Sequence, residues 1–139
     1  MNYWLFKSEP DVFSFDDLKK KGKSGDEWTG VRNFLARKNM KSMQKGDLGF
    51  FYHSNIGKEI VGIVEVVKTA HPDSTDKTGQ WECVDVCAVE AVPKPVTLAV
   101  VKSTPKLAKM ALVTSARLSV QPVTADEWKL ICKLGGVSP

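Results

Sequence analysis

Three adjacent polar residues end the first aromatic segment of the chain: Lys7, Ser8 and Glu9. Side chains alternate along an extended strand, so we expect Lys7 and Glu9 on one face and Ser8 on the other. A cation and a carboxylate on one wall could bind a polar ligand. The same three residues could equally be the solvated end of a strand.

A second group of candidates lies where a loop is expected to enter a helix: Trp28, Gly30, Arg32 and Asn33. Glycine lets a ligand approach the backbone, and a helix N-terminus offers free N–H groups. The arginine and asparagine could bind a base edge or a phosphate, and the tryptophan could stack on an unstacked base. The alternative is that Trp28 is a core residue and that Arg32 forms a surface ion pair.

A third group ends a predicted strand: Tyr52, His53 and Ser54. A lone histidine near a strand end is more often a hydrogen-bonded structural residue than a catalytic one. No Gly-x-Ser-x-Gly turn occurs, so the sequence does not favour a Ser-His-Asp hydrolase.

Cofactor and metal chemistry find little support in the sequence. No phosphate-binding glycine loop of either common type occurs, so nucleotide hydrolysis and nicotinamide chemistry are not expected. Cys83 and Cys87 lie within a predicted strand, and His53 and His71 are isolated along the chain. We therefore expect neither a cofactor nor a metal site.

Composition and length predict one domain over residues 1–139. The chain is 42% hydrophobic and 26% charged, which is near the average for globular proteins. No apolar run approaches the roughly 20 residues of a membrane span, and the N-terminus lacks the pattern of a secretory signal. Three cysteines are an odd number, which fits free thiols in a reducing compartment. We expect a cytoplasmic protein with structural cysteines and no membrane partner.

Positive charge is concentrated in one part of the chain. The net charge is +4, and residues 19–45 carry nine basic residues against Asp26 and Glu27. The bases are Lys19, Lys20, Lys21, Lys23, Arg32, Arg37, Lys38, Lys41 and Lys45. Such clustering suggests a polyanion such as nucleic acid, although a solvated lysine face would look the same.

Both strands and helices are expected along the chain to position these candidate residues. Strands are expected at residues 2–7, 48–54, 59–68, 81–92 and 117–120, and helical segments at 14–18, 31–43, 97–103, 105–110 and 124–134. Residues 48–54 and 59–68 carry apolar side chains at both parities, which indicates a sheet buried on both faces. The sequence predicts a barrel-like α+β domain.

Several separated motifs together resemble the EVE domain family. They are Tyr3 to Pro10, Trp28 to Asn33, Gly46-Asp47, Phe50 to Ser54, Ile60 to Ile63, Val84 to Val86, Arg117 to Val120 and Glu127-Trp128. The resemblance runs in order over essentially the whole chain. It departs at Lys58-Glu59, where a Pro-Gly is common, and between Asp76 and Trp81, where larger members carry a longer loop.

This resemblance implies a PUA-like pseudo-β-barrel of about five to six strands with flanking short helices. It also implies a non-catalytic, cofactor-free module that binds modified DNA or RNA, with a methylated or oxidised cytosine flipped into an aromatic pocket. The pocket residues it implies are Lys7, Ser8, Glu9, Trp28, Val31, Arg32, Asn33, Tyr52, His53, Ser54, Arg117 and Ser119.

A small amidohydrolase acting on modified nucleosides is the alternative. Some PUA-like relatives of the ASCH group use a lysine, a hydroxyl residue and a glutamate, and Lys7, Ser8 and Glu9 supply these types. The expected alternation of the strand argues against it, because Ser8 would point away from the other two.

Overall fold

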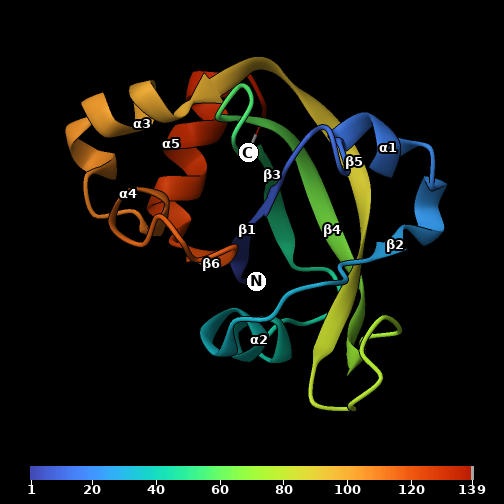
Figure 1. Cartoon of the computed structure of the whole chain (residues 1–139). Coiled ribbons are helices and arrows are strands. Elements are labelled where there is room, and N and C mark those ends of the chain that lie inside the picture. Colours follow the sequence, from blue (N-terminus) through green and yellow to red (C-terminus); the bar gives the residue numbers. More distant parts are fainter. Residues whose placement is uncertain (139) are drawn as a thin grey trace.

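A six-stranded mixed sheet organises the chain in the computed structural model, which describes residues 1–138 (Figure 1). The strands are β1 (Tyr3–Ser8), β2 (Asp26–Glu27), β3 (Leu48–His53), β4 (Glu59–Pro72), β5 (Glu82–Thr97) and β6 (Val120–Val123). The α-helices are α1 (Phe15–Lys19), α2 (Phe34–Lys41), α3 (Leu98–Ser103), α4 (Ala111–Thr114) and α5 (Ala125–Gly135). Two 3-10 turns occupy Gly22–Ser24 and Pro105–Leu107.

The strands follow the order β2-β5-β4-β3-β1-β6, in which β1 and β3 are parallel and all other neighbours are antiparallel. The edge strands β2 and β6 are not paired with each other, so the sheet curls without closing. Helix α2 contacts both β5 and β6, and Asn39 Nδ2 donates to the Val120 carbonyl at 2.8 Å. Helix α2 thus covers one end of the curled sheet, and the predicted α+β pseudo-barrel is confirmed.

The sheet is buried on both faces, as the apolar residues at both parities predict. Along β1, Trp4 and Phe6 enter one core cluster and Leu5 enters a second. Along β3, Phe51 belongs to the first cluster and Phe50 to the second. The C-terminal helix α5 covers the second cluster, with Trp128 stacked on Phe50 at 4.1 Å between ring centroids.

Two of the helices begin with capping boxes. Ser14 and Asp17 exchange hydrogen bonds at the start of α1, and Thr124 and Glu127 do so at the start of α5. Helix α1 also lies unusually close to the sheet, because a Cβ at Gly62 would stand 2.3 Å from the Phe15 ring.

Several predicted boundaries were wrong, including those of β4, which runs to Pro72 instead of residue 68, and of the turn at Pro105–Leu107, expected to reach 110. The helix expected at 31–43 spans only Phe34–Lys41, because Asn33 is an extended N-cap whose Oδ1 accepts from the Ala36 N–H. The strand expected at 117–120 begins instead at Val120 and continues to Val123. Pro122 is tolerated there because β6 is an edge strand, where a missing N–H leaves no pairing partner unsatisfied.

The strand expected to end at the prolines after residue 92 was also predicted too short. Strand β5 continues through Pro93 and Pro95 to Thr97, since the register shifts between Gly62↔Ala91 and Ile60↔Val96 and the prolines fall inside this irregularity. The two-residue strand β2 was not predicted at all. It pairs with β5 directly before Trp28, and this pairing positions the candidate site.

Candidate functional site

A cavity of about 470 Å³ lies between the end of β1 and the segment that follows β2. Its lining is Lys7, Ser8, Val12, Phe13, Asp26, Glu27, Trp28, Thr29, Gly30, Val31, Arg32 and Ser119. The structure therefore brings together seven of the residues singled out from the sequence: Lys7, Ser8, Trp28, Gly30, Val31, Arg32 and Ser119. Sequence reasoning missed the carboxylates of Asp26 and Glu27, which share the wall with the two cations.

Lys7 and Ser8 both face this cavity, although alternation predicted opposite faces. The reason is that the cavity lies at the end of β1 rather than on one side of it, since the pairing of β1 with β6 stops at Phe6↔Val120. Lys7 Nζ donates to the Ala116 carbonyl at 2.5 Å, and burial lowers the pKa of this ammonium. The Ser8 hydroxyl donates to the Phe13 carbonyl at 2.6 Å.

Trp28 forms the inner wall of the cavity and is at the same time a core residue. Its side chain is only 8% exposed and lies edge-on to Phe6, Phe13 and Phe51, with centroid distances of 5.2, 6.3 and 5.4 Å. Its backbone N–H donates to the Val84 carbonyl at 2.8 Å, which continues the pairing of β2 with β5. Trp28 is therefore a core residue, as one of the two alternatives held, and its side chain also lines the cavity.

The remaining sequence candidates lie outside the lining of the cavity: Glu9, Asn33, Tyr52, His53, Ser54 and Arg117. Glu9 accepts a hydrogen bond from Asn55 Nδ2 at 2.5 Å, and Asn33 caps α2. Tyr52 is buried in the second core cluster, on the side of β3 away from Phe51.

His53 is a hydrogen-bonded structural residue, as a lone histidine at a strand end suggests. Its Nε2 accepts from the Phe15 N–H at 3.1 Å, in the first turn of α1. Burial lowers the pKa of His53 against the opposing charges of Glu59 and Asp16, which favours the neutral ring that this hydrogen bond requires. Ser54 donates its backbone N–H to the Ser8 carbonyl, and Arg117 is exposed in the turn before β6.

A buried carboxylate from a distant loop holds the segment that carries Arg32. Asp73 Oδ2 accepts from the Gly30 N–H at 2.9 Å and from Arg32 Nη1 at 3.1 Å, and Oδ1 accepts from the Thr75 N–H and hydroxyl. Burial alone would raise the pKa of Asp73, but these hydrogen bonds together hold it below its usual value. Gly30 has φ +82°, a conformation that favours glycine.

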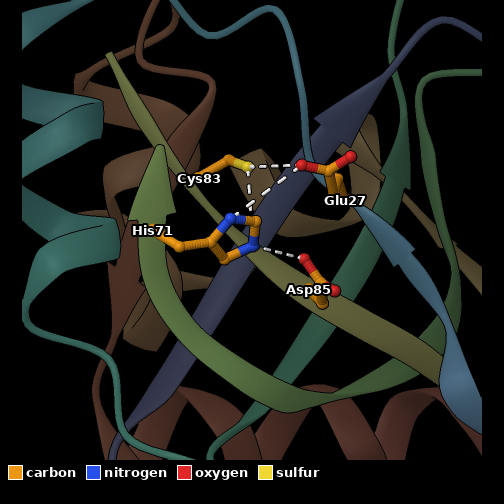
Figure 2. A group of neighbouring side chains, drawn as sticks. All are labelled: Glu27, His71, Cys83 and Asp85. Atoms are coloured by element: carbon orange, nitrogen blue, oxygen red, sulfur yellow. Dashed lines mark hydrogen bonds and ion pairs between the residues drawn. The ribbon is translucent and has the colours of Figure 1, made fainter. Parts of the chain in front are cut away.

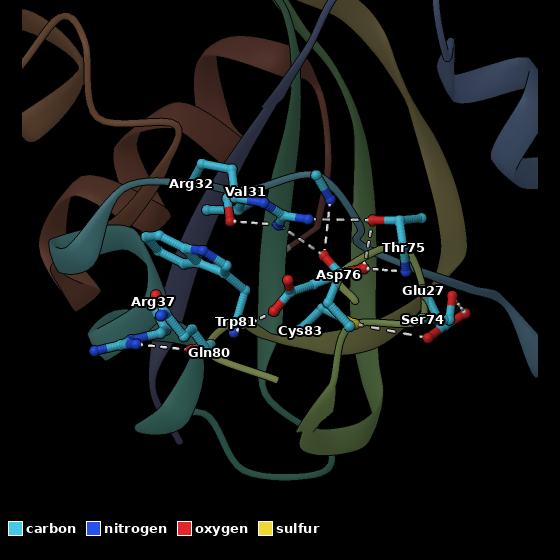
Figure 3. A network of polar contacts seen from close by, with 12 residues as sticks. Glu27, Val31, Arg32, Arg37, Ser74, Thr75, Asp76, Gln80, Trp81 and Cys83 are labelled. Carbon is cyan, nitrogen blue, oxygen red and sulfur yellow. Dashed lines mark hydrogen bonds and ion pairs between the residues drawn. The ribbon is translucent and has the colours of Figure 1, made fainter. Parts of the chain in front are cut away.

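The same loop presents an aromatic surface beside the cavity. Trp81 stacks on Phe34 at 5.1 Å, although Phe34 is 67% exposed. The Arg32 guanidinium lies 5.6 Å from the Trp81 ring, and that of Arg37 lies 5.3 Å from it (Figure 3). We call Arg32, Phe34, Arg37 and Trp81 the aromatic ridge. Sequence reasoning had placed Trp81 only at the start of a strand, because nothing along the chain links it to residues 32–37.

Residues 19–45, which we call the basic segment, are partly neutralised by nearby acidic side chains. Lys19 pairs with Asp16 at 3.7 Å, Lys21 with Asp26 at 3.6 Å and Lys41 with Glu82 at 3.6 Å. All three lysine side chains remain about half exposed, so they can still reach an external anion.

The three cysteines, Cys83, Cys87 and Cys132, are buried free thiols, as expected. Within residues 1–138, no helix combines the length and the apolar character that crossing a membrane requires.

The curled, open sheet with α2 across one end and a cavity beside it defines a PUA-like domain. A YTH domain of Zygosaccharomyces rouxii shares this fold with a TM-score of 0.59 and 22% identity, over 96% of this chain and 86% of that one. The EVE domain model matches residues 2–134, and the chain belongs to this family.

Relatives of known structure cover the whole chain. Protein Atu2648 from Agrobacterium tumefaciens has a TM-score of 0.95 and 57% identity, over 99% of this chain and 94% of that one. The human THYN1 protein, solved in complex with DNA containing 5-methylcytosine, has a TM-score of 0.91 and 34% identity, over 100% of both chains. Mouse thymocyte nuclear protein 1 is 35% identical over an alignment of 170 positions, which covers 99% of this chain and 75% of the relative.

Proposed function

We propose that this protein is a non-catalytic nucleic-acid-binding module that takes a modified base, methylated or oxidised cytosine foremost, into the cavity beside Trp28. One observation carries the proposal: an aromatic ring, two cations and two carboxylates line a single cavity of about 470 Å³. This volume lies within the range of small-molecule sites, roughly 300–1,000 Å³.

The donors and acceptors of the cavity suit a cytosine edge. A carboxylate accepts from the exocyclic amine of cytosine, and Asp26 offers this group. Lys7 and Arg32 offer donors for the ring nitrogen and the carbonyl on the same edge. The apolar surfaces of Trp28, Phe13 and Val31 give a methyl substituent a place out of water.

Energetics favour a modified base over an unmodified one. Flipping a base out of its stack costs a few kcal/mol, and stacking on an aromatic ring returns roughly 1–3 kcal/mol. Because these terms nearly cancel, the burial of one additional methyl group, worth about 0.8 kcal/mol, changes occupancy several-fold.

Binding affinity that does not depend on the identity of the base would come from residues around the cavity. The aromatic ridge can stack on neighbouring bases, and the lysines of residues 19–45 can contact phosphates. The human relative in complex with 5-methylcytosine DNA supports this use of the fold.

The amidohydrolase alternative gains no support from the geometry. Glu9 is bonded to Asn55 outside the cavity lining, and the Ser8 hydroxyl donates to a backbone carbonyl rather than to a base. A cytoplasmic location stays a prediction. Three free thiols are consistent with it, because thiols stay reduced in the cytosol.

The test is a binding series on matched oligonucleotides at one salt concentration. Fluorescence anisotropy compares DNA with one 5-methylcytosine, one 5-hydroxymethylcytosine or plain cytosine, and RNA with one N6-methyladenosine. We expect a modified cytosine to bind most tightly and Lys7→Met to remove this preference. Lys106→Met, an exposed lysine outside the cavity, makes the same charge change and should keep it. Equal affinity for every strand would refute the proposal.

A turnover assay distinguishes a non-catalytic binding module from an amidohydrolase. Acylated and methylated nucleosides are incubated with the protein and analysed by chromatography. We expect recovery of unchanged nucleoside. A product that forms with the wild-type chain and not with Ser8→Ala would establish the enzyme instead.

A further inference from the structure

A cluster of four potential metal ligands lies where β2, β4 and β5 meet. The side chains of Glu27, His71, Cys83 and Asp85 point toward one another from these three strands (Figure 2). One ligand atom from each lies within 4.8 Å of all the others. Glu27 also lines the cavity, whereas the other three do not.

The register of the sheet creates this cluster. His71 is paired with Cys83 across β4 and β5, and Glu27 is paired with Asp85 across β2 and β5. Cys83 and Asp85 are two residues apart on one strand and so share a face. The sequence-based expectation of no metal relied on the isolation of His71 along the chain, and antiparallel pairing removes that reason.

Distances within the cluster approach those of a tetrahedral site. His71 Nε2 lies 2.7 Å from Asp85 Oδ1 and 4.0 Å from Cys83 Sγ, which is 3.8 Å from Glu27 Oε1. Metal–ligand bonds of about 2.0–2.3 Å place tetrahedral ligand atoms roughly 3.3–3.8 Å apart. Shifts of less than about 1 Å would therefore complete the geometry, which side-chain rotations can supply.

The histidine is held in the orientation that a metal ligand needs. His71 Nδ1 lies 3.0 Å from the Pro72 carbonyl. The 2.7 Å contact between Nε2 and Asp85 Oδ1 needs a proton between these two atoms, and a bound metal ion would replace that proton while Nδ1–H donates to the Pro72 carbonyl. Metal-ligating histidines commonly donate their second N–H to a backbone carbonyl or a carboxylate in this way.

The cluster also concentrates negative charge in a poorly hydrated place. Cys83 is fully buried, and the side chains of His71 and Asp85 are each 19% exposed. Burial, together with the charges of Asp73, Glu27 and Asp85, raises the pKa of the Cys83 thiol to about 12. A divalent cation would offset the repulsion between these groups and would bind the thiolate in place of its proton.

We propose that Glu27, His71, Cys83 and Asp85 bind one divalent cation of the zinc class. Nitrogen, sulfur and oxygen donors in one set suit Zn²⁺ and Co²⁺ better than Mg²⁺ or Ca²⁺, which prefer oxygen alone. Four protein ligands leave no open position, so the ion is structural. It ties β2 to β4 and β5 and thereby fixes Trp28, the residue next to Glu27, at the cavity wall.

The test is a titration of chelator-treated, tag-free full chain with Co²⁺ and then Zn²⁺. We expect one Co²⁺ per chain, with a thiolate-to-cobalt charge-transfer band that Zn²⁺ abolishes. We also expect Zn²⁺ to raise the melting temperature. Cys83→Ser should lose the band, whereas Cys87→Ser, a buried cysteine farther along β5 and outside the cluster, should keep it.

Glu27→Gln and Asp85→Asn keep the test decisive if Cys83→Ser folds poorly, because both are partly exposed and nearly isosteric. Each should weaken Zn²⁺ binding by at least about tenfold. The proposal is overturned if excess Co²⁺ gives no charge-transfer band in the wild type. It is equally overturned if the band persists in Cys83→Ser, or if Zn²⁺ stabilises Glu27→Gln as much as the wild type.

Discussion

The buried carboxylate of Asp73 accepts a hydrogen bond from the backbone N–H of Gly30 at 2.9 Å, across 43 positions of sequence. The loop after β4 therefore holds the segment between Trp28 and Arg32 in place. Because Gly30 belongs to the cavity lining, the shape of the cavity depends on a residue outside it.

Replacing this carboxylate should loosen the cavity wall. Asp73→Ala removes the acceptor of four hydrogen bonds, and we expect a loss of unfolding free energy of about 1.5–3 kcal/mol. Asp11→Ala removes an exposed carboxylate and should change stability little. Chemical denaturation of both variants checks this, and equal stability of the two would contradict the role given to Asp73.

Acid should release the loop between residues 73 and 81 before the rest of the fold. Hydrogen bonds from Thr78 and the Trp81 N–H lower the pKa of Asp76 from 3.8 to about 2. A lowered pKa means that the charged form stabilises the loop above about pH 4 and that this contribution is lost as the pH falls toward 2. The N–H of Trp81 donates to Asp76 Oδ2 at 2.7 Å. Its protection against hydrogen exchange, measured relative to an unprotected amide at the same pH, should fall in this window.

Asp76→Asn provides the control for the acid effect, since its amide does not titrate. Exchange at Trp81 in this variant should be fast at neutral pH and should show no step between pH 4 and 2. A step near pH 2 that survives in the variant would assign the transition to another group.

Much of the fold follows from local sequence signals. Two helix starts are indicated by capping pairs within four residues, Ser14 with Asp17 and Thr124 with Glu127. Apolar residues at both parities of a strand indicate a sheet that is covered on both faces. Strand β2 was missed because two residues carry no periodicity. The end of β6 was misplaced because Pro122 is acceptable on an edge strand, and edge position is a property of the whole sheet.

The candidate site was only partly predictable because its walls come from distant segments. Lys7, Ser8 and Trp28 lie in recognisable motifs, and they do line the cavity. Tyr52 is adjacent in sequence to residues of the first core, yet its side chain faces the second core. The contacts of Asp73 with Arg32 and Gly30 carry no local signal, since these two partners lie 41 and 43 residues away.

The three thiols should be unreactive in the native, chelator-treated protein. Burial raises the pKa of Cys83 to about 12 and that of Cys132 to about 11, and it also raises the pKa of Cys87. Because only the thiolate reacts, iodoacetamide at pH 8 should label none of the three, and it should label all three after unfolding in guanidinium chloride. Mass spectrometry counts the labels, and rapid modification of a cysteine in the native state would disprove their structural role.

Charge reversal in the basic segment should weaken binding without changing selectivity. We expect Lys19→Glu, Lys20→Glu and Lys21→Glu together to lower affinity similarly for modified and unmodified strands, because phosphate contacts carry no base identity. The slope of log affinity against log salt should fall by about 1 for each lysine that contacts a phosphate.

The matched control is a second lysine triple, Lys102, Lys106 and Lys109, all exposed near α3. Reversing these three charges changes the net charge by the same amount. If this control weakens binding as much as the first triple, the effect reflects overall charge and not a docking surface.

Trp28 and Trp128 offer a paired test of the cavity, because both are buried and only Trp28 lines it. Trp28→Leu and Trp128→Leu each remove a large ring from a core, and each should lower the unfolding free energy, up to about 3–5 kcal/mol. Melting temperature therefore cannot distinguish their roles. The ratio of affinities for modified and unmodified strands can.

Only Trp28→Leu should lower that ratio, since it removes the stacking face worth roughly 1–3 kcal/mol to a flipped base. Trp128 stacks on Tyr3 and Phe50 in the second core cluster, so its loss destabilises the fold without touching the bound base. Measurements are made well below both melting temperatures, where each variant is folded. If the two variants keep the wild-type ratio, Trp28 supports the fold alone and recognition of the base must lie elsewhere. If both lose it equally, selectivity depends on overall rigidity and not on the ring of Trp28.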